Sequence, residues 1–427
     1  MNYNKAVYWF TTDQRLNFNC AIDALLNYSS EVAFVFIFDL NWFKKNNFDL
    51  EPLGQNRLKY LIESLTDLQN ELNEIGFELT LLMGDPVSSL REFTKFNKID
   101  TLIVSEQVGS NERSALTEIK TTIPELNVIK FYNSTLLTPD DLPKPLKTYS
   151  KFRQFIEAQD FDFTLPESQL PPILPKAIST QSDITLNDIT ALFGNNEKAD
   201  VKKEQQLFFG GEKAAQYHLS HYFSTDAPSY YKETRNELDG WINSTKFSPY
   251  LANGNVSAKQ IWMLVDQYEA DVIKNQSTYW IKFELLWREY FQWISIQQDK
   301  KLFKFEGIAD KAPNTKYDAL SFNAWCMGNT PYPLVNACMK QLNAIGYISN
   351  RGRQIVASCL INELNLDWRY GAAYFEKQLI DYDVAANWGN WQYIAGVGQD
   401  VQGGRHFHIR KQTELYDPEH MFIDKWT

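Results

Sequence analysis

The sequence has no hydrophobic run long enough to cross a membrane. Its longest uninterrupted apolar stretch is Val32–Phe38, whereas a transmembrane helix requires about 20 such residues. The N-terminus also lacks the longer apolar region of a secretory signal peptide. We therefore expect a soluble, cytoplasmic protein.

Cysteine and histidine are scarce, with four and five copies among 427 residues. The cysteines show no C-x-x-C spacing, so neither a zinc ribbon nor a disulfide framework is indicated. The pairs His218/His221 and His406/His408 each lack a third ligand at metal-site spacing. We predict reduced, mostly buried thiols and no bound metal.

The chain also has no excess of basic over acidic residues. The chain has 53 acidic and 42 basic residues and a formal net charge of −11. Proteins that bind nucleic acid over a broad surface are usually basic, because neutralising phosphates supplies most of their non-specific affinity. Any function on DNA must therefore rest on a local basic cleft.

Aromatic residues, by contrast, are plentiful. The chain contains 12 Trp, 22 Tyr and 28 Phe, which is more aromatic surface than an ordinary core needs. This composition favours a protein that packs or stacks a flat ligand.

Short β-rich runs alternate with helical patterns in the first third of the chain. This rhythm predicts a parallel sheet covered by helices on both faces, as in a Rossmann-like domain, although no G-x-G-x-x-G follows the first strand. We expect strands at Ala6–Phe10, Val32–Phe38, Glu78–Leu82, Thr101–Val104 and Asn127–Tyr132, and helices at Asn19–Tyr28, Asn56–Ile75, Pro86–Phe96 and Asn111–Thr121.

The remaining sequence divides into a connector and a helical half. Proline-rich sequence without clear periodicity follows the α/β pattern and includes one possible helix, Lys147–Ala158. Helical patterns then continue to the end. We predict an α/β domain over residues 1–132, a connector over 133–204 and an all-α domain over 205–427.

Several polar residues of the helical half interrupt otherwise apolar faces. Ser244–Ser248 lies just before a predicted helix and either caps it or holds a pyrophosphate at its N-terminus. Arg353 and Asp381 form either a structural ion pair or part of a ligand site. Because buried charges are costly unless paired, a cluster of such residues favours a polar ligand in the core.

Two stretches, Asn350–Gln354 and Asn387–Tyr393, resemble the flavin pocket of the photolyase/cryptochrome family. Five further blocks occur in the family's order: Phe209–Glu212, Ser244–Pro249, Glu284–Tyr290, Asp367–Arg369 and Tyr416–Pro418. The α/β half is similar to the family's antenna domain, so the resemblance covers essentially the whole chain.

Within the family, the sequence is most similar to the DASH cryptochromes. Gln354 stands where ordinary cyclobutane-dimer photolyases usually have Met, and Tyr393 stands where they have Trp. Asp140–Pro143 followed by Phe152 and Arg153 resembles the DASH connector.

The resemblance implies that the helical domain binds FAD. Asn387 matches the residue that faces flavin N5 and helps to set the redox and protonation state of the flavin. The implied FAD-binding residues are Tyr231, Ser244, Thr245, Lys246, Phe247, Ser248, Glu284, Arg288, Asn350, Arg353, Asp381, Asp383 and Asn387.

The resemblance also implies catalytic and DNA-binding residues. Glu284 matches a carboxylate that hydrogen-bonds a pyrimidine dimer, for which we expect a raised pKa, and Trp287 matches an aromatic that stacks on the flipped dimer. The implied catalytic set is Glu284, Trp287, Asn350, Arg351 and Asn387, and the implied DNA-binding set is Arg235, Trp287, Arg288, Arg351, Gln354, Tyr393 and Arg405.

Two further sites follow from the resemblance. Trp391 and Trp368 match the inner members of an electron-transfer chain, whose third member is replaced by Thr315, with Tyr317 the nearest candidate. Glu112, within Asn-Glu-Arg, matches the glutamate that binds a methenyltetrahydrofolate antenna.

The family implies one of two functions. The first is blue-light-dependent repair of cyclobutane pyrimidine dimers, preferentially in single-stranded DNA, by electron transfer from reduced FAD. The alternative is a blue-light photoreceptor without repair activity. In either case we expect a monomer without membrane association.

Overall fold

A parallel sheet organises the N-terminal part of the computed structural model, which describes residues 3–159, 161–165, 168, 170–194, 207–399 and 404–427. The five expected strands run in the order β3-β2-β1-β4-β5. Each lies within a few residues of its expected position, so the predicted parallel sheet is confirmed. They are β1 (Tyr3–Phe10), β2 (Ser29–Asp39), β3 (Leu79–Gly84), β4 (Thr101–Ser105) and β5 (Asn127–Phe131).

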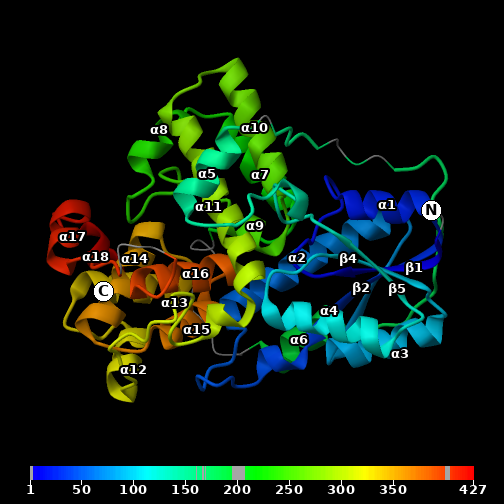
Figure 1. The fold of residues 1–427 in the computed structure, drawn as a ribbon, viewed down its shortest axis with the longest axis horizontal. Coiled ribbons are helices and arrows are strands. Elements are labelled where there is room, and N and C mark those ends of the chain that lie inside the picture. Colours follow the sequence, from blue (N-terminus) through cyan, green and yellow to red (C-terminus); the bar gives the residue numbers. More distant parts are fainter. Residues whose placement is uncertain (1–2, 160, 166–167, 169, 195–206, 400–403) are drawn as a thin grey trace.

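Helices cover both faces of this sheet (Figure 1). Tyr8 and Phe10 of β1 pack on one face with α1 (Cys20–Tyr28) and α2 (Gln55–Glu74). Val7 and Trp9 pack on the other face with α3 (Pro86–Asn97) and α4 (Ser110–Thr122). Burial on both faces explains why the central strands are continuously apolar rather than alternating.

The connector returns to the α/β domain more than its sequence predicts. The expected helix is present as α5 (Tyr149–Glu157), which packs on the helical domain. The short strand β6 (Lys176–Ala177) then pairs with β2, and α6 (Leu186–Phe193) buries Ile189 in the core that contains α1 and α2. The sequence predicted neither β6 nor α6, because each is too short to establish a period.

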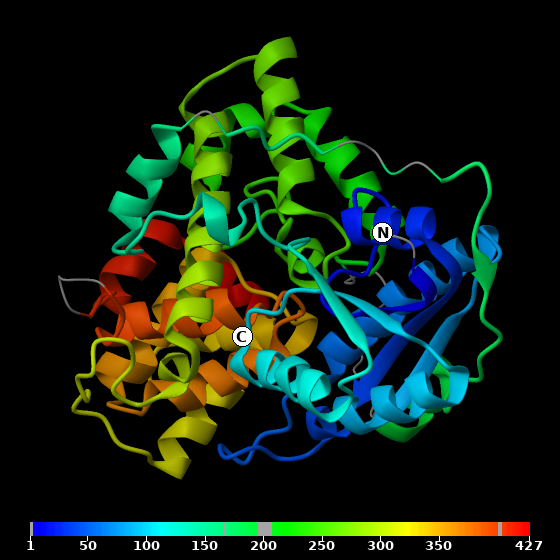
Figure 2. The same cartoon turned by 45° about the vertical axis from the view of Figure 1, so that its right-hand side comes forward.

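The rest of the described chain is helical, as predicted. Its longest helix, α11 (Gln276–Gln298), contacts α5, α8, α10 and α16 and so passes through the centre of the domain (Figure 2). No helix in the described ranges has the length and apolar character needed to span a bilayer.

The other helical elements of this domain are α7 (Glu212–Phe223), α8 (Ala227–Thr234), α9 (Ser248–Asn253), α10 (Ala258–Asp271), α12 (Ala319–Met327), α13 (Pro333–Ile345), α14 (Asn350–Ser358), α15 (Trp368–Gln378), α16 (Val384–Ala395), α17 (Ile409–Tyr416) and α18 (Met421–Trp426). Short 3-10 or π-helical turns among the described residues are η1 (Leu40–Phe43) after β2, η2 (Pro139–Asp141) in the connector, η4 (Asp299–Phe303) after α11 and η5 (Cys359–Glu363) after α14.

Buried polar groups join the two domains. The guanidinium of Arg15 is buried and donates to the carbonyl oxygens of Gly254 at 2.9 Å and Asn133 at 3.1 Å. In return, the Glu212 carboxylate accepts hydrogen bonds from the backbone N–H groups of Leu16 and Asn17. Each charged group is therefore satisfied by backbone of the neighbouring segments, which fixes how the domains meet.

Candidate flavin and DNA site

Helix α11 presents Glu284 and Trp287 one turn apart on the same face. The Glu284 carboxylate forms an ion pair with Arg235, which directly follows α8. Burial raises the pKa of Glu284, while the positive charge of Arg235 partly opposes this rise. The direction of this shift agrees with the sequence expectation.

The indole of Trp287 is held by aromatic neighbours. The Tyr149 ring of α5 stacks on it with centroids 3.5 Å apart and planes inclined by 13°. Phe291, one turn further along α11, lies with its centroid 5.5 Å away. The Tyr149 hydroxyl donates to the carbonyl oxygen of Phe283 at 3.0 Å, so the connector fixes the orientation of Trp287.

A cavity beside α14 and α16 brings together many of the predicted residues. Helix α14 provides three of them, and α16 with the segment before it provides the others. The predicted residues that line this cavity are Asn350, Arg353, Gln354, Asp381, Asp383, Asn387, Trp391 and Tyr393.

Arg353 and Asp381 do form the predicted ion pair. Arg353 Nη2 lies 2.7 Å from Asp381 Oδ2, and the Ser248 hydroxyl donates to the same oxygen at 2.6 Å. The other carboxylate oxygen, Oδ1, is buried and has no hydrogen-bond partner among the described residues. Since buried acceptors are rarely left unsatisfied, this oxygen marks a place for a ligand donor.

Asp383 begins α16 as its N-cap and accepts from the backbone N–H of Ala386 at 3.0 Å. Gln292 Nε2 also donates to it at 2.6 Å, and Arg288 Nη2 lies 3.6 Å away. Arg288 donates in addition to the carbonyl oxygen of Ser134 at 2.6 Å. Arg288 therefore links Ser134 of the connector to Asp383, which is predicted to bind FAD. A DNA contact by Arg288 stays a prediction.

The segment Ser244–Ser248 does not cap a helix. The N-cap of α9 is Phe247, which makes no side-chain capping hydrogen bond, and the hydroxyl of Ser248 bonds Asp381 instead. The capping interpretation is therefore wrong. Lys246 Nζ donates to Ser244 Oγ at 2.8 Å, and the Thr245 carbonyl oxygen contacts His218 Nε2 at 2.7 Å.

Asn387 and Tyr231 are two further residues predicted to contact the flavin, of which only Asn387 lines the cavity beside α14 and α16. The Asn387 amide donates to the carbonyl oxygen of Ala372 at 3.0 Å, which turns its own oxygen away from α15. Tyr231 is buried, and desolvation raises the pKa of its hydroxyl well above the usual value. Both side chains can therefore offer uncharged polar groups to a ligand.

The two predicted electron-transfer tryptophans are both buried. Trp391 contacts the rings of Trp325 and Phe375, whereas Trp368 contacts Trp388. Gly371 of α15 allows the Trp391 approach, because a Cβ there would lie 2.2 Å from Trp391 Cη2. The electron-transfer role of the tryptophans stays a prediction.

Arg351 and Arg405 are two further predicted DNA contacts. Arg351 donates to Asn236 Oδ1 at 3.1 Å and lies over the Tyr416 ring. Arg405 lies over the Tyr393 ring at 5.1 Å. The roles of Arg351 and Arg405 on DNA also stay predictions.

The sequence analysis missed Trp280. An interaction of the Trp280 side chain with the Glu284 carboxylate lowers the pKa of Glu284, against the larger rise that burial causes. The spacing Trp280, Glu284, Trp287 places all three on one face of α11, a pattern that is visible in the sequence.

The residues present fit FAD. Two buried acceptors, Asp381 Oδ1 and Gln354 Oε1, have no hydrogen-bond partner among the described residues, and both residues line the cavity beside α14 and α16. A large cofactor with hydroxyl and ring N–H groups can donate to such acceptors.

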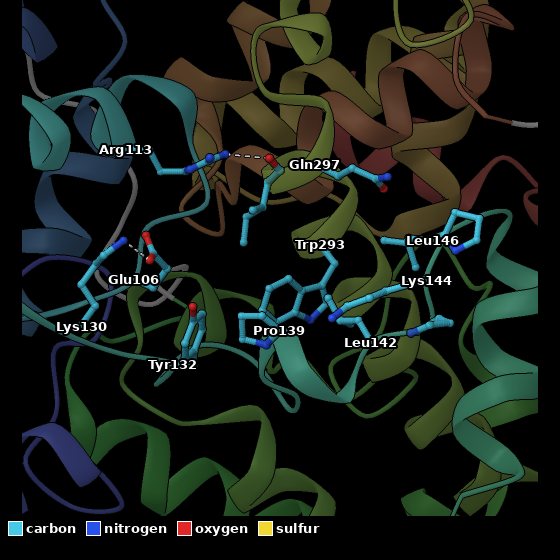
Figure 3. A pocket seen from close by; sticks show the side chains of 13 residues that line it. Glu106, Arg113, Lys130, Tyr132, Pro139, Leu142, Lys144, Leu146, Trp293 and Gln297 are labelled. Carbon is cyan, nitrogen blue, oxygen red and sulfur yellow. Dashed lines mark hydrogen bonds and ion pairs between the residues drawn. The ribbon is translucent and has the colours of Figure 1, made fainter.

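A separate cavity of about 380 Å³ lies between the α/β domain, η2 and the end of α11 (Figure 3). Tyr132 and Trp293, whose ring centroids are 5.8 Å apart, line it, and Lys130 pairs with Glu106 at its edge. Arg113 lines this cavity, but its neighbour Glu112 does not. Glu112 instead faces the positive charge of Arg57, and burial raises its pKa.

Comparisons with known proteins agree with this arrangement. A family model described as "DNA photolyase" matches residues 6–175, and one described as "FAD binding domain of DNA photolyase" matches residues 280–427. A protein named cryptochrome DASH from Idiomarina loihiensis is 43% identical, over 100% of this chain and 93% of its own length. Another of that name, from Vibrio parahaemolyticus, is 42% identical over 98% and 92%.

Solved structures give the same result. A Synechocystis cryptochrome superposes with a TM-score of 0.91 at 33% identity, covering 100% of this chain and 89% of its own. A class III photolyase from Agrobacterium tumefaciens gives 0.86 at 26% identity, covering 100% and 87%. With relatives that span its whole length, and with a helical domain in which one cavity gathers many of the predicted site residues, the chain belongs to the photolyase/cryptochrome family and is a flavoprotein of the cryptochrome DASH type.

Proposed function

We propose that this protein repairs cyclobutane pyrimidine dimers in DNA under blue light and prefers single strands. The observation that carries the proposal is the pairing of Arg235 with Glu284 one turn from Trp287 on α11. An aromatic ring and a carboxyl group of raised pKa then lie side by side, as a flipped pyrimidine requires.

Each residue has a defined part in this reaction. Trp287, whose plane Tyr149 fixes, offers an aromatic surface to the flipped dimer. Glu284, when it holds a proton, donates a hydrogen bond to a pyrimidine carbonyl oxygen and opposes the build-up of negative charge there. Arg235 keeps the carboxyl group in place.

The chain binds its cofactor through a different set of residues. Asp381, Asp383 and Asn387 would hold FAD, and Arg353 would keep the Asp381 carboxylate oriented. When bound and reduced, FAD supplies the electron that light drives to the dimer and takes it back after the ring has split.

The preference for single strands follows from charge and from the cost of base flipping. A net charge of −11 gives little general attraction to a duplex. Extruding a dimer from a duplex also costs a few kcal/mol of stacking and pairing, and a single strand avoids much of this cost.

The test is dimer loss from a defined oligonucleotide. Purified protein with chemically reduced FAD is mixed with a thymine-dimer oligonucleotide, single-stranded or duplex, under blue light or in the dark. We expect light-dependent loss, faster on the single strand, and a fall of at least about tenfold for Glu284→Ala. Glu419→Ala, at an exposed position, is the matched control.

Absence of repair on both strands, in protein that shows a full flavin spectrum, would contradict the proposal. Light-dependent binding of a protein partner by the same sample would then support the photoreceptor alternative.

We extend the proposal to a methenyltetrahydrofolate antenna at the domain boundary. A solved photolyase from Sulfolobus tokodaii, with a TM-score of 0.77, is described with two FAD molecules and a "novel light-harvesting cofactor". Addition of methenyltetrahydrofolate should give a bound chromophore whose excitation is transferred to FAD. Glu112→Gln should abolish binding of the chromophore if Glu112 holds the pterin, whereas Trp293→Ala should abolish it if the cavity of Figure 3 holds the pterin.

That the protein is cytoplasmic and monomeric stays a prediction.

A further inference from the structure

A cavity of about 300 Å³ adjoins Trp287 on the side of α5. Tyr393 lines both this cavity and the one proposed to hold FAD, whereas neither Glu284 nor Asn350 nor Gln354 lines the cavity beside Trp287. Its other lining residues include Tyr149, Ser150, Gln399 and Arg405. It is therefore a second compartment on the same face of the molecule.

We propose that this compartment receives one unpaired nucleobase next to the dimer in a single strand. The inference rests on the proposed function. The volume exceeds that of one nucleobase, and the shared residues Trp287 and Tyr393 place the compartment directly beside the site proposed for the dimer.

The walls suit a flat ring. The Tyr149 ring stacks on Trp287 with centroids 3.5 Å apart, and both residues line the cavity. Phe291 lines the cavity further along α11. Aromatic surfaces of this kind bind nucleobases of any sequence, because every base has a π-face.

Polar groups at the edge suit a nucleotide. The Tyr290 hydroxyl lies 2.9 Å from both Gln399 Oε1 and the Lys147 carbonyl oxygen, and this contact places the Gln399 NH₂ group on the other side of the amide. The Ser150 side chain lines the same cavity, and the Arg405 guanidinium beside Tyr393 brings positive charge to a chain of net charge −11. Phosphate between the two bases would lie near this charge.

The compartment favours single strands for a physical reason. A neighbouring base in a duplex can enter it only after a further base pair is broken, which adds to the cost of flipping the dimer. An unpaired neighbour enters without that cost. The structure thus supplies a contact that a duplex cannot use.

The experiment measures binding in the dark by fluorescence anisotropy. Single-stranded oligonucleotides carry one thymine dimer, with the nucleotide on the 5′ or the 3′ side replaced by an abasic analogue. We expect one of the two replacements to raise the Kd of the native protein by about 5- to 30-fold. The corresponding duplexes should show no such difference.

Gly398 offers a way to fill the compartment. It lines the cavity, and a Cβ there would meet its nearest neighbours at an ordinary 3.5 Å. Gly398→Phe should weaken binding of the intact single strand and abolish the effect of the abasic replacement. Gly398→Ala, which adds one methyl group, should change the Kd less than about twofold. Gln399→Leu removes the amide without filling the space and should lose part of the effect.

Three outcomes would overturn the inference. The first is that neither abasic replacement changes the Kd of the native protein. The second is that Gly398→Phe weakens binding of both abasic oligonucleotides as strongly as binding of the intact one, which would mean that the cavity holds the dimer itself. Failure of the native protein to bind any dimer-containing strand would remove the proposed function as well, whereas normal binding without a neighbour effect would remove only this inference.

Discussion

Asp381 uses only one of its two carboxylate oxygens within the protein: Oδ2 lies 2.7 Å from Arg353 Nη2, and Oδ1 is buried without a hydrogen-bond partner in the described residues. The pair thus fixes a carboxylate while leaving one acceptor for a ligand. A buried charge held by one cation is sensitive to the loss of that cation.

Replacing Arg353 by leucine should destabilise the protein and release FAD. The Asp381 carboxylate would remain buried without its cation, at a cost of up to about 3 kcal/mol, the lower end for such pairs because the Arg353 side chain is 25% exposed. The measurement is the ratio of flavin to protein absorbance after dialysis, together with the free energy of unfolding. Arg410→Leu, at an exposed i,i+4 pair, should leave both unchanged. Full flavin content in the Arg353 variant would contradict the role assigned to the pair.

The stability of the domain contact should fall as the pH rises. Glu71 of α2 lies beside Glu212, and burial together with that second carboxyl group raises the pKa of Glu71 to about 8. An exposed glutamate titrates near about 4.3, so the folded state holds this proton more tightly than the unfolded chain. The contribution is fully present below about pH 4 and is lost as the pH rises through 8.

Thermal unfolding at pH 6 and pH 8.5 checks this expectation. The native protein should unfold at a lower temperature at pH 8.5, and Glu71→Gln, which keeps an uncharged side chain at every pH, should reduce that difference. Glu78→Gln, at an exposed position, serves as the control. Equal pH dependence in Glu71→Gln and in the native protein would show that another group controls it.

Local sequence patterns predicted the elements of this fold that bury long apolar runs, but not those that depend on contacts with distant segments. Strands of the sheet were predictable because burial on both faces demands long apolar runs, whereas β6 and α6 depend on contacts with β2 and α1 that no local pattern records. The Arg353–Asp381 pair was predictable as one of two alternatives, because a buried charge needs a partner. The stack of Tyr149 on Trp287 was not predictable from the sequence, because it forms only when α5 packs on α11.

Photoreduction of the flavin should depend on Tyr317. Its ring is 49% exposed and stacks on Tyr370 with centroids 4.1 Å apart, on the same helix as Trp368. A tyrosine at the surface can lose an electron and a proton, whereas phenylalanine is far harder to oxidise. Tyr317→Phe should therefore slow photoreduction in the presence of an external reductant.

The rate of photoreduction is measured by illuminating the protein for set times and recording the absorbance of the flavin after each. Tyr217→Phe, at a tyrosine that is 77% exposed, is the matched control. An unchanged rate in Tyr317→Phe would show that electrons enter by another route.

A negative charge at position 387 should change the state of the bound flavin. The Asn387 amide is anchored to the carbonyl oxygen of Ala372, so Asn387→Asp would lose this hydrogen bond and place a carboxylate at the cavity. A nearby negative charge disfavours negatively charged forms of the flavin. The form that accumulates under illumination should shift toward a protonated, neutral one, visible in the absorbance spectrum. The same spectrum in Asn387→Asp and native protein would place residue 387 outside the electrostatic reach of the ring.

The buried Arg15 guanidinium has a consequence for attempts to divide the protein. Its acceptors Gly254 and Asn133 belong to segments far apart in sequence, and the backbone next to Arg15 is held by Glu212. A fragment that ends at residue 132 would lose Gly254, Asn133 and Glu212, and the Arg15 guanidinium would lose the backbone acceptors of its buried site. We therefore expect the two halves to unfold in a single cooperative transition, and the flavin to act as a ligand of the whole chain, since its binding stabilises both domains through this shared contact.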